Sequence, residues 1–197
     1  MNFEELSKNE ELNKDYRIFW RKGESNSVII APHGGNIEPG TTEIGNAIAG
    51  KFHSFYTFEG IKPTTNRELH ITSTSFDEPQ GIKLVKESTH VLALHGCTGG
   101  DDMVYIGGLD TALKDKVQNN LLGAGFKTGE HDNHELQGIN PYNICNRGIK
   151  GQGVQLELSA GLRKKMFYSL RAKDRNKQTE LFEKFVLAVK EALSAEE

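Results

Sequence analysis

The sequence has little cysteine, no excess of positive charge and no long hydrophobic run, and each of these absences excludes a class of protein. Only Cys97 and Cys145 occur among the 197 residues, and they form no CxxC pair, so a disulfide-stabilised fold is not expected. The 24 basic and 27 acidic side chains give a net charge of −3, which provides no overall cationic field for nucleic acid or an acidic membrane surface. No apolar run approaches the roughly 20 residues that cross a bilayer.

Short runs of β-branched and aromatic residues alternate with helix-like stretches along the chain. Their pattern predicts strands at residues 17–20, 28–31, 54–58, 69–72, 91–94, 104–106 and 154–158. Apolar residues at helical spacing predict helices at residues 41–52, 108–122 and 175–194. The polar stretch 129–138 and the basic stretch 163–177 are predicted as exposed loops. The fold class is therefore α/β, a single domain with a mixed, mainly parallel sheet flanked by helices.

Side chains capable of chemistry end or interrupt the apolar strands. His33 ends one strand and is followed by two glycines and then Glu38, His95 ends a second strand, and Glu157 interrupts a third. Because ligand sites of such sheets lie beyond the carboxyl ends of the strands, we expect these side chains to share one cavity. A charge buried at Glu157 without a partner would be costly, so the residue needs compensation or a function.

The residue types fit a catalytic zinc centre, which takes three ligands from His, Asp or Glu and keeps a position open for water. His33, Glu38 and His95 supply such a set. Glu157 lies outside it and is predicted to take the proton of the attacking water and to return it to the leaving amine. Each histidine alone would more simply be a structural residue. A structural zinc is disfavoured, because such sites close with four ligands rich in cysteine and Cys97 has no partner.

Five segments, in the order APHGGNIEPGTTEI, LHITSTSFDEP, VLALHG, YNICNRG and GVQLELSAGLR, together resemble the poly-γ-glutamate hydrolase family of bacilli and their phages and prophages. The resemblance covers about residues 15–193 of a domain spanning 1–197. It implies a zinc carboxypeptidase-like fold, cleavage of the γ-amide bonds of poly-γ-glutamate, zinc at His33, Glu38 and His95, and Glu157 as the catalytic carboxylate. The carboxypeptidase pair is more closely spaced, HxxE, so the loop between His33 and Glu38 must differ, and the glycine pair permits this.

An anionic polymer with a carboxylate on every residue requires local positive charge in the cleft. Asn146 and Arg147 form an Asn-Arg pair similar to the one that carboxypeptidases use on a substrate carboxylate, although here it follows the third ligand in the chain. The equal alternative is a capped turn with Arg147 at the surface. Arg163, shortly after Glu157, is the third candidate for substrate binding.

The sequence thus predicts a zinc-dependent hydrolase of poly-γ-glutamate, a monomer without nucleic-acid or membrane partners. Two alternatives stay open: a deacylase of small N-acyl amino acids with the same metal site in a short closed pocket, and a non-catalytic phage or prophage accessory protein. His131 and His134 could form a second metal site, but an exposed polar loop is the preferred interpretation of the segment around them. The acidic N-terminus lacks the apolar segment of a secretory signal, so we expect the protein to be cytoplasmic as synthesised, with release by host lysis left open.

Overall fold

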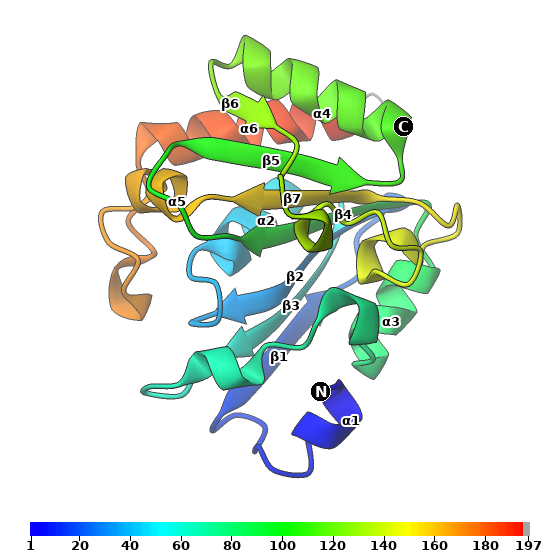
Figure 1. Cartoon of the computed structure of the whole chain (residues 1–197), viewed down its shortest axis with the longest axis vertical. Coiled ribbons are helices and arrows are strands. Elements are labelled where there is room, and N and C mark those ends of the chain that lie inside the picture. The colour runs from blue at the N-terminus through cyan, green and yellow to red at the C-terminus, as the bar shows by residue number, and fades with distance from the viewer. Residues whose placement is uncertain (195–197) are drawn as a thin grey trace.

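The computed structural model describes residues 1–194 of the chain and consists of seven strands and six α-helices joined by short 3-10 helices (Figure 1). The strands are Tyr16–Arg21 (β1), Ser27–Gly35 (β2), Ser54–Gly60 (β3), His90–Gly96 (β4), Met103–Gly108 (β5), Lys127–Gly129 (β6) and Val154–Leu158 (β7). The α-helices are Phe3–Leu6 (α1), Thr41–Ala49 (α2), Pro79–Lys86 (α3), Thr111–Gly123 (α4), Ala160–Met166 (α5) and Glu180–Ser194 (α6). The 3-10 helices are Asn66–Leu69 (η1), Ser73–Ser75 (η2), His134–Leu136 (η3), Ile144–Asn146 (η4) and Ala172–Asp174 (η5).

All seven strands form one mixed sheet in the order β1-β3-β2-β4-β7-β5-β6. The pairs β2–β3, β2–β4, β4–β7 and β5–β6 are parallel, whereas β1–β3 and β5–β7 are antiparallel. The carboxyl ends of β2, β4 and β7 therefore lie at the same edge of the sheet, on the left in Figure 1. This edge brings together residues that are far apart in the sequence.

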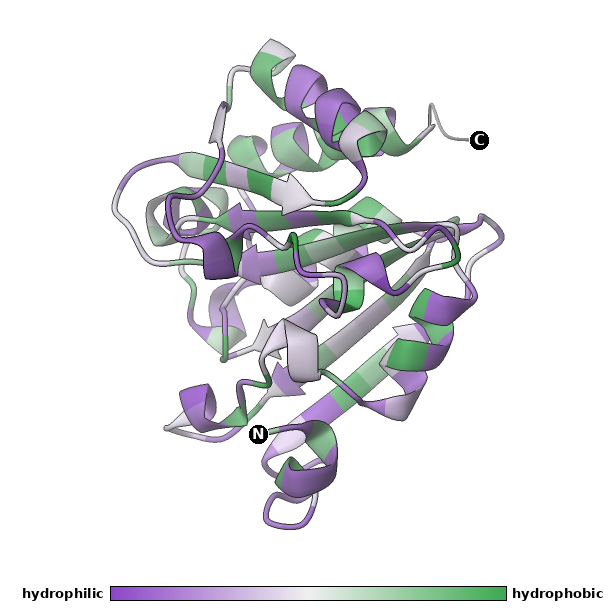
Figure 2. Cartoon of the chain, turned by 45° about the vertical axis from the view of Figure 1, so that its right-hand side comes forward, coloured by the Kyte–Doolittle hydropathy of each residue, from purple (hydrophilic) through white to green (hydrophobic). Residues whose placement is uncertain are grey.

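Two apolar clusters cover the two faces of the sheet. One contains side chains of α2, α4, α5 and α6 packed on inward-facing residues of the strands, such as Leu92, Leu94, Leu156 and Leu158. The other, smaller cluster lies on the opposite face and includes Leu6 of α1 and residues of α3. Figure 2 shows the hydrophobic residues concentrated on the central strands, while hydrophilic and hydrophobic residues alternate along the helices. None of the helices in residues 1–194 combines the length and apolar character that crossing a membrane requires.

The strands predicted at 17–20, 28–31, 54–58, 91–94, 104–106 and 154–158 are confirmed, as is the α/β class. The strand predicted at 69–72 is wrong. Leu69 and Ile71 are buried while His70 faces out, which is the alternation of a strand, but this segment joins no ladder of the sheet. Alternating burial arises here from the end of η1 and the extended loop that follows it, both packed on the core, and the burial pattern alone does not distinguish such a segment from a strand.

The helix limits also differ from the prediction: the helix predicted at residues 41–52 ends at Ala49, and two other helices begin later than predicted. The helix predicted from residue 108 begins at Thr111, because the Asp110 side chain caps it by accepting a hydrogen bond from the Leu113 N–H. The helix predicted from residue 175 begins at Glu180. Arg175 is instead anchored outside the helix, where its guanidinium donates to Glu43 and Asn36. The predicted basic loop 163–177 contains the end of α5, which was not expected.

Candidate metal centre and pocket

His33 and Glu38 are brought together by an irregular end of β2. The register of β2 against β3 shifts between Ala31 and Gly34, and Gly35 has a φ of +63°, a left-handed conformation that favours glycine. The chain then turns back, so that the Glu38 N–H donates to the His33 carbonyl at 2.9 Å. Glu38 Oε1 lies 3.0 Å from His33 Nδ1. The glycine pair thus accommodates the wider spacing between histidine and glutamate.

His95 approaches the same point from the end of β4. Its Nδ1 lies 3.0 Å from His33 Nδ1 and 3.6 Å from Glu38 Oε2. The backbone N–H of Gly96 donates to Glu38 Oε2 at 2.8 Å and so orients the carboxylate. Both histidines are buried. The structure therefore brings the three predicted ligands together, each with a donor atom directed at a common centre.

The outer nitrogens of both histidines have partners of their own. His33 Nε2 lies 2.7 Å from the Ile71 carbonyl oxygen, which can only accept a hydrogen bond. Nε2 therefore carries a proton and donates it to this carbonyl, which leaves Nδ1 as the nitrogen that faces Glu38. His95 Nε2 contacts Ser73 Oγ at 3.5 Å. Metal-binding histidines are typically oriented in this way, by a hydrogen bond to the ring nitrogen that does not bind the metal.

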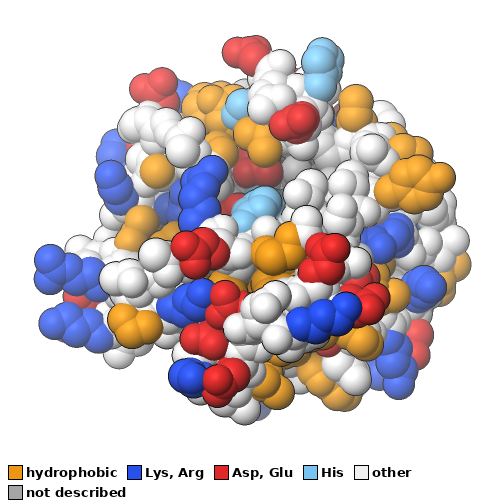
Figure 3. Space-filling view, turned by 60° about the horizontal axis from the view of Figure 1, so that its bottom comes forward, with side chains coloured by type: hydrophobic (Ala, Val, Ile, Leu, Met, Phe, Trp, Pro, Cys, Tyr) orange, Lys and Arg blue, Asp and Glu red, His pale blue; other side chains and the backbone are white. Residues whose placement is uncertain are grey.

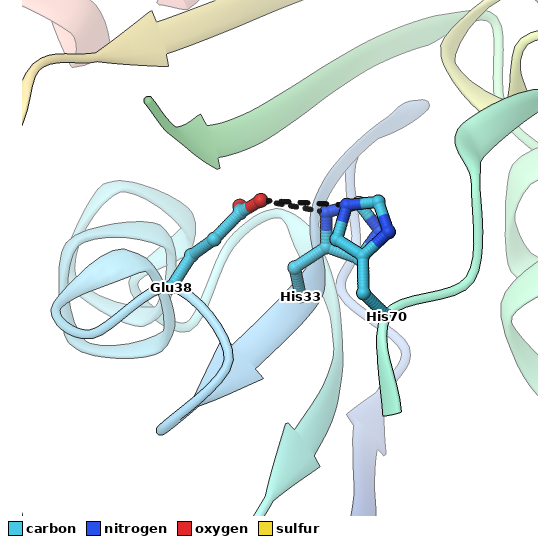
Figure 4. Close-up of side chains that lie close together, drawn as sticks. All are labelled: His33, Glu38 and His70. Atoms are coloured by element: carbon cyan, nitrogen blue, oxygen red, sulfur yellow. Dashed lines mark hydrogen bonds and ion pairs between the residues drawn. The ribbon is translucent and has the colours of Figure 1, made fainter. Parts of the chain in front are cut away.

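His70 is a fourth side chain at this centre, and the sequence reasoning did not assign it a role. Its ring lies on that of His33, with 3.8 Å between ring centres, and its Nε2 is 3.8 Å from Glu38 Oε1 (Figure 4). Donor atoms of His33, Glu38 and His70 all lie within 4.8 Å of one another. His95 lies closer to Glu38 than His70 does, at 3.6 Å against 3.8 Å. The His95 side chain is also buried, whereas 39% of the His70 side chain is exposed. We therefore favour His95 as the third donor.

The charges of this cluster are strongly coupled. Burial alone would raise the pKa of Glu38, but the adjacent His33 and His95 hold it well below its usual range. Burial lowers the pKa of His33, but the Glu38 carboxylate more than offsets this and the net shift is upward. Burial and the charge of His33 lower the pKa of His70 to about 4. The carboxylate thus requires a positive partner, which a bound cation would supply in place of a proton.

Glu157 lies beside this cluster, in β7. It is paired in register with His95 of β4 and with Tyr105 of β5, and only 4% of it is exposed. Burial raises the pKa of Glu157 to about 7, and the nearby Glu38 also raises it, while His95 and Arg163 act in the opposite direction. The carboxyl group is therefore poised to gain or lose a proton near neutral pH.

The cluster lies in a pocket with a volume of about 480 Å³. Figure 3 shows the corresponding face of the molecule, with histidine and acidic side chains gathered in a central hollow. The other residues that line the pocket include the segment 72–74, residues 96–98 at the end of β4, and Glu135 and Leu136 of η3. The pocket is thus bounded by loops at the carboxyl edge of the sheet, as the sequence predicts.

Arg163 lines this pocket, but its guanidinium is occupied by the protein backbone. The side chain is buried and donates to the carbonyl oxygens of Leu158, Pro39 and Cys97 at 3.1, 2.8 and 3.0 Å. A Cβ on Gly96 would lie 2.5 Å from the guanidinium carbon, so the close approach requires glycine there. Arg163 therefore fastens the strand ends around the site and contributes positive charge to it.

Asn146 and Arg147 lie outside the lining of the pocket. The Asn146 amide donates to the carbonyls of Gly138 and Asn140 and accepts from the N–H groups of Leu109 and Gly153, which uses its full hydrogen-bonding capacity. Asn146 therefore has a structural role, and its side chain has no hydrogen-bonding group left for a substrate.

Arg147 is directed at backbone carbonyls and does not line the pocket that holds the candidate metal centre. Its Nη2 donates to the carbonyls of Ser73 and Phe76 at 3.3 and 2.6 Å, and the side chain borders a separate surface hollow beside Asp77. It thereby fixes the segment that carries Ser73, the neighbour of His95. The geometry favours the capped-turn alternative for this segment over direct binding of substrate.

Arg67 was not singled out from the sequence, yet it lines the pocket and is exposed. It belongs to η1, and its charge contributes to the low pKa of His70. The second metal site considered for the loop 129–138 finds no support in residues 1–194, where the donor clusters are formed by His33 and Glu38 with His70 or His95 and include no residue of that loop. His134 Nδ1 instead contacts Gln137 Oε1 at 2.8 Å.

Comparison with known sequences identifies relatives over most of the chain. A model of the poly-gamma-glutamate hydrolase family matches residues 1–188. The chain is 38% identical over 175 residues to the UPF0714 protein YndL of Bacillus subtilis (strain 168), an alignment that covers 87% of the chain and 69% of YndL. It is 37% identical to the SPbeta prophage-derived UPF0714 protein YoqZ of the same organism, over 89% of the chain and 64% of YoqZ.

Two solved structures share the fold. A bacteriophage poly-gamma-glutamate hydrolase superposes with a TM-score of 0.94 at 31% identity, covering 99% of this chain and 96% of the other. A zinc-free apo form of YndL superposes with a TM-score of 0.93 at 36% identity and the same coverage.

Proposed function

The chain belongs to the poly-gamma-glutamate hydrolase family, and from this premise we propose that it is a zinc-dependent hydrolase of the γ-amide bonds of poly-γ-glutamate. One observation carries the proposal: three donor side chains and a separate buried carboxyl group lie together in one pocket. The donors are His33, Glu38 and His95, and the separate carboxyl group is that of Glu157. This division between ligands and base is the arrangement that metal-assisted hydrolysis requires.

The donor set fits zinc in chemistry and spacing. Two donors on one tetrahedral zinc lie about 3.3 Å apart when each is about 2.0–2.1 Å from the metal. The separations from His33 Nδ1 to Glu38 Oε1 and to His95 Nδ1 are both 3.0 Å, and that from His95 Nδ1 to Glu38 Oε2 is 3.6 Å. A zinc ion held by these donors would acidify a water molecule and polarise the amide carbonyl.

Glu157 supplies the proton transfers. Its carboxylate takes a proton from the water that attacks the amide carbon, and it then gives this proton to the leaving nitrogen as the C–N bond breaks. In the metal-free protein burial raises the pKa of Glu157 to about 7, and a carboxyl group that titrates near the working pH can both accept and return a proton. Burial is the main cause of the raised pKa of Glu157, and the nearby Glu38 carboxylate adds to it, while His95, Arg163 and Gln155 act in the opposite direction.

The cationic side chains of the pocket suit an anionic polymer. Each residue of poly-γ-glutamate carries a free α-carboxylate. The protein itself has a net charge of −3, so its overall charge does not attract this polymer. Attraction must therefore come from local charges, and the arginines that line the pocket are Arg67 and Arg163. Of these, Arg67 has the exposed guanidinium, so we assign contact with a substrate carboxylate to Arg67 and assembly of the site to Arg163.

The test is cleavage of poly-γ-glutamate by the purified, zinc-loaded protein, followed by solution viscosity and by the size of the products. We expect chain shortening that a chelator abolishes and added zinc restores. The Glu157→Gln protein is the control for a contaminating hydrolase. Release of single acyl groups from N-acyl amino acids, with the polymer left intact, would support the deacylase alternative instead, and binding without any cleavage would support the accessory-protein alternative.

A further inference from the structure

A buried amide lies against the carboxyl group of Glu157. Gln155 precedes Glu157 by two positions in β7, so both side chains emerge on the same face of the sheet. Gln155 Nε2 lies 3.1 Å from Glu157 Oε1 and 3.0 Å from the Leu136 carbonyl oxygen. The opposite end of the amide, Oε1, lies 2.9 Å from Asn143 Nδ2. The three side chains form a continuous buried row.

Backbone groups at both ends fix the direction of the hydrogen bonds in this row. The Cys145 N–H can only donate, and it donates to Asn143 Oδ1 at 3.1 Å. The amino group of Asn143 must then face Gln155 and donate to its Oε1. The amino group of Gln155 is thereby directed away from Asn143, toward the Leu136 carbonyl, which can only accept. Reversing either amide would place like groups against each other at two contacts.

The neighbouring strands leave space for this row. Gln155 is paired in register with Ala93 of β4 and with Gly107 of β5, which carry small side chains or none. Gly138, with a φ of +64°, passes so close to Gln155 that an added Cβ would lie 2.9 Å from the Gln155 Cβ. The loop that contributes Leu136 and Asn143 is thus packed directly on the Gln155 side chain.

We propose that Asn143 and Gln155 are positioning residues for Glu157, and that they commit its Oε1 to accepting a hydrogen bond while leaving Oε2 to carry the proton. This inference rests on the proposed role of Glu157 as the base. The proton lost by the attacking water forms a bond to Oε2 and passes from there to the leaving amine nitrogen, while Oε1 retains its hydrogen bond from Gln155 throughout. The amide also prevents the carboxyl group from rotating away from the reacting water.

The most informative substitution is Asn143→Asp, which lies two hydrogen bonds from Glu157. A carboxylate at position 143 still accepts from the Cys145 N–H, but it presents an oxygen to Gln155 Oε1 and favours rotation of that amide. Glu157 would then face an oxygen in place of a donor. We expect kcat to fall by roughly tenfold or more, with KM changed by less than about twofold and zinc content unchanged.

Asn140→Asp is the matched control. Asn140 accepts from the Tyr142 N–H at 2.9 Å, two residues ahead, as Asn143 does from Cys145. It lies in the same loop but is exposed, so the variant adds the same charge without reversing the row. We expect its kcat to equal that of the wild type. Gln155→Met provides a second variant if Asn143→Asp does not fold, because it keeps the length of the side chain and removes the donor.

A double-mutant cycle with Glu157→Gln separates positioning from simple support of the fold. If the row acts through Glu157, Asn143→Asp and Gln155→Met should lower the residual rate of the Glu157→Gln protein little or not at all. Equal losses with and without Glu157, or no loss in the wild-type background, would overturn the proposal.

Side-chain amide NMR of the zinc-free protein gives a readout that is independent of catalysis. The Gln155 amino group should show slow hydrogen exchange, and its resonances should move in both Glu157→Gln and Asn143→Asp. Resonances that do not respond to either substitution would refute the row of hydrogen bonds. Absence of polymer hydrolysis by the wild type would refute the proposed function instead, while leaving this measurement valid.

Discussion

The Nδ1 atoms of His33 and His95 face each other at 3.0 Å inside the protein, although 62 positions separate the two residues in the sequence. Two neutral imidazoles with lone pairs directed at each other repel, so the contact needs a proton or a cation between them. The outer nitrogen of His33 is committed to a backbone carbonyl, and Ser73 lies beside that of His95. We therefore expect this buried pair, together with Glu38, to hold a cation.

We predict that His33→Ala and His95→Ala each lose zinc, because either change leaves too few donors to compete with water. His70→Ala is the matched comparison, since His70 contacts the same cluster from its exposed side, and we expect it to retain close to one zinc per chain. Metal analysis after dialysis against a weak chelator makes the measurement. Loss of zinc in His70→Ala with retention in His95→Ala would assign the third donor to His70.

The second prediction concerns Glu157→Gln, which keeps the shape of the side chain and removes the base. We expect zinc content and polymer binding to be retained while kcat falls by roughly 10²–10⁴-fold, the usual contribution of general acid–base catalysis. Glu38→Gln should lose metal affinity as well, because its carboxylate belongs to the donor set. Single-turnover cleavage and metal content, measured on the same preparations, distinguish the two roles. A Glu157→Gln protein with near-normal turnover would contradict the mechanism.

The meeting of His33, Glu38, His95 and Glu157 could be anticipated from the sequence, because buried parallel strands deliver their carboxyl ends to one edge. The roles of Arg147 and Asn146 could not be anticipated from the sequence. A turn rich in asparagine predicts capping equally well as substrate binding, and only the fold determines that Arg147 points toward the carbonyls of Ser73 and Phe76. Side-chain direction in a turn depends on contacts with distant segments that local sequence does not specify.

His70 was missed for a related reason. Leu69 and Ile71 alternate with polar neighbours, which predicts a strand with His70 on its solvent-facing side. In the folded protein, this extended segment crosses the site instead, and its Ile71 carbonyl bonds to His33. The signal available in the sequence was the run of hydroxyl residues from Thr72 to Ser75, which continues the polar character past His70.

The third prediction is that Arg67→Ala raises KM for the polymer by roughly two- to fivefold at low salt, the range expected for loss of an exposed ion pair. Its kcat should change little, and added salt should reduce the difference from the wild type, because screening weakens exposed charge pairs. Arg171→Ala, which removes an exposed arginine outside the pocket lining, controls for net charge. Equal effects of the two variants would remove Arg67 from the substrate site.

The fourth prediction concerns stability of the zinc-free protein as pH changes. Burial raises the pKa of Glu157 from 4.5 to about 7, so between these values the folded state binds more protons at this carboxyl group than the unfolded state does. Its contribution to the free energy of unfolding therefore falls as pH rises through this window. At ~1.4 kcal/mol for each pKa unit, the loss reaches up to about 3 kcal/mol.

Other titratable groups mask this pH dependence of the free energy of unfolding in the wild type. The pKa of His70 is lowered to about 4, so its contribution to the free energy of unfolding increases between about pH 4 and 6.5. The pKa of Glu38 is also lowered, so the stability that this carboxylate contributes is fully present above its ordinary pKa. The informative quantity is the difference between Glu157→Gln and wild type in urea unfolding, measured with a chelator present. We expect the variant to gain relative stability steadily from pH 4.5 to 7. The control is Glu191→Gln, at an exposed position of α6, whose free energy of unfolding should differ from that of the wild type by the same amount at every pH. A constant difference for Glu157→Gln as well would contradict the prediction, because the Glu157 carboxyl group would then titrate alike in the folded and unfolded protein.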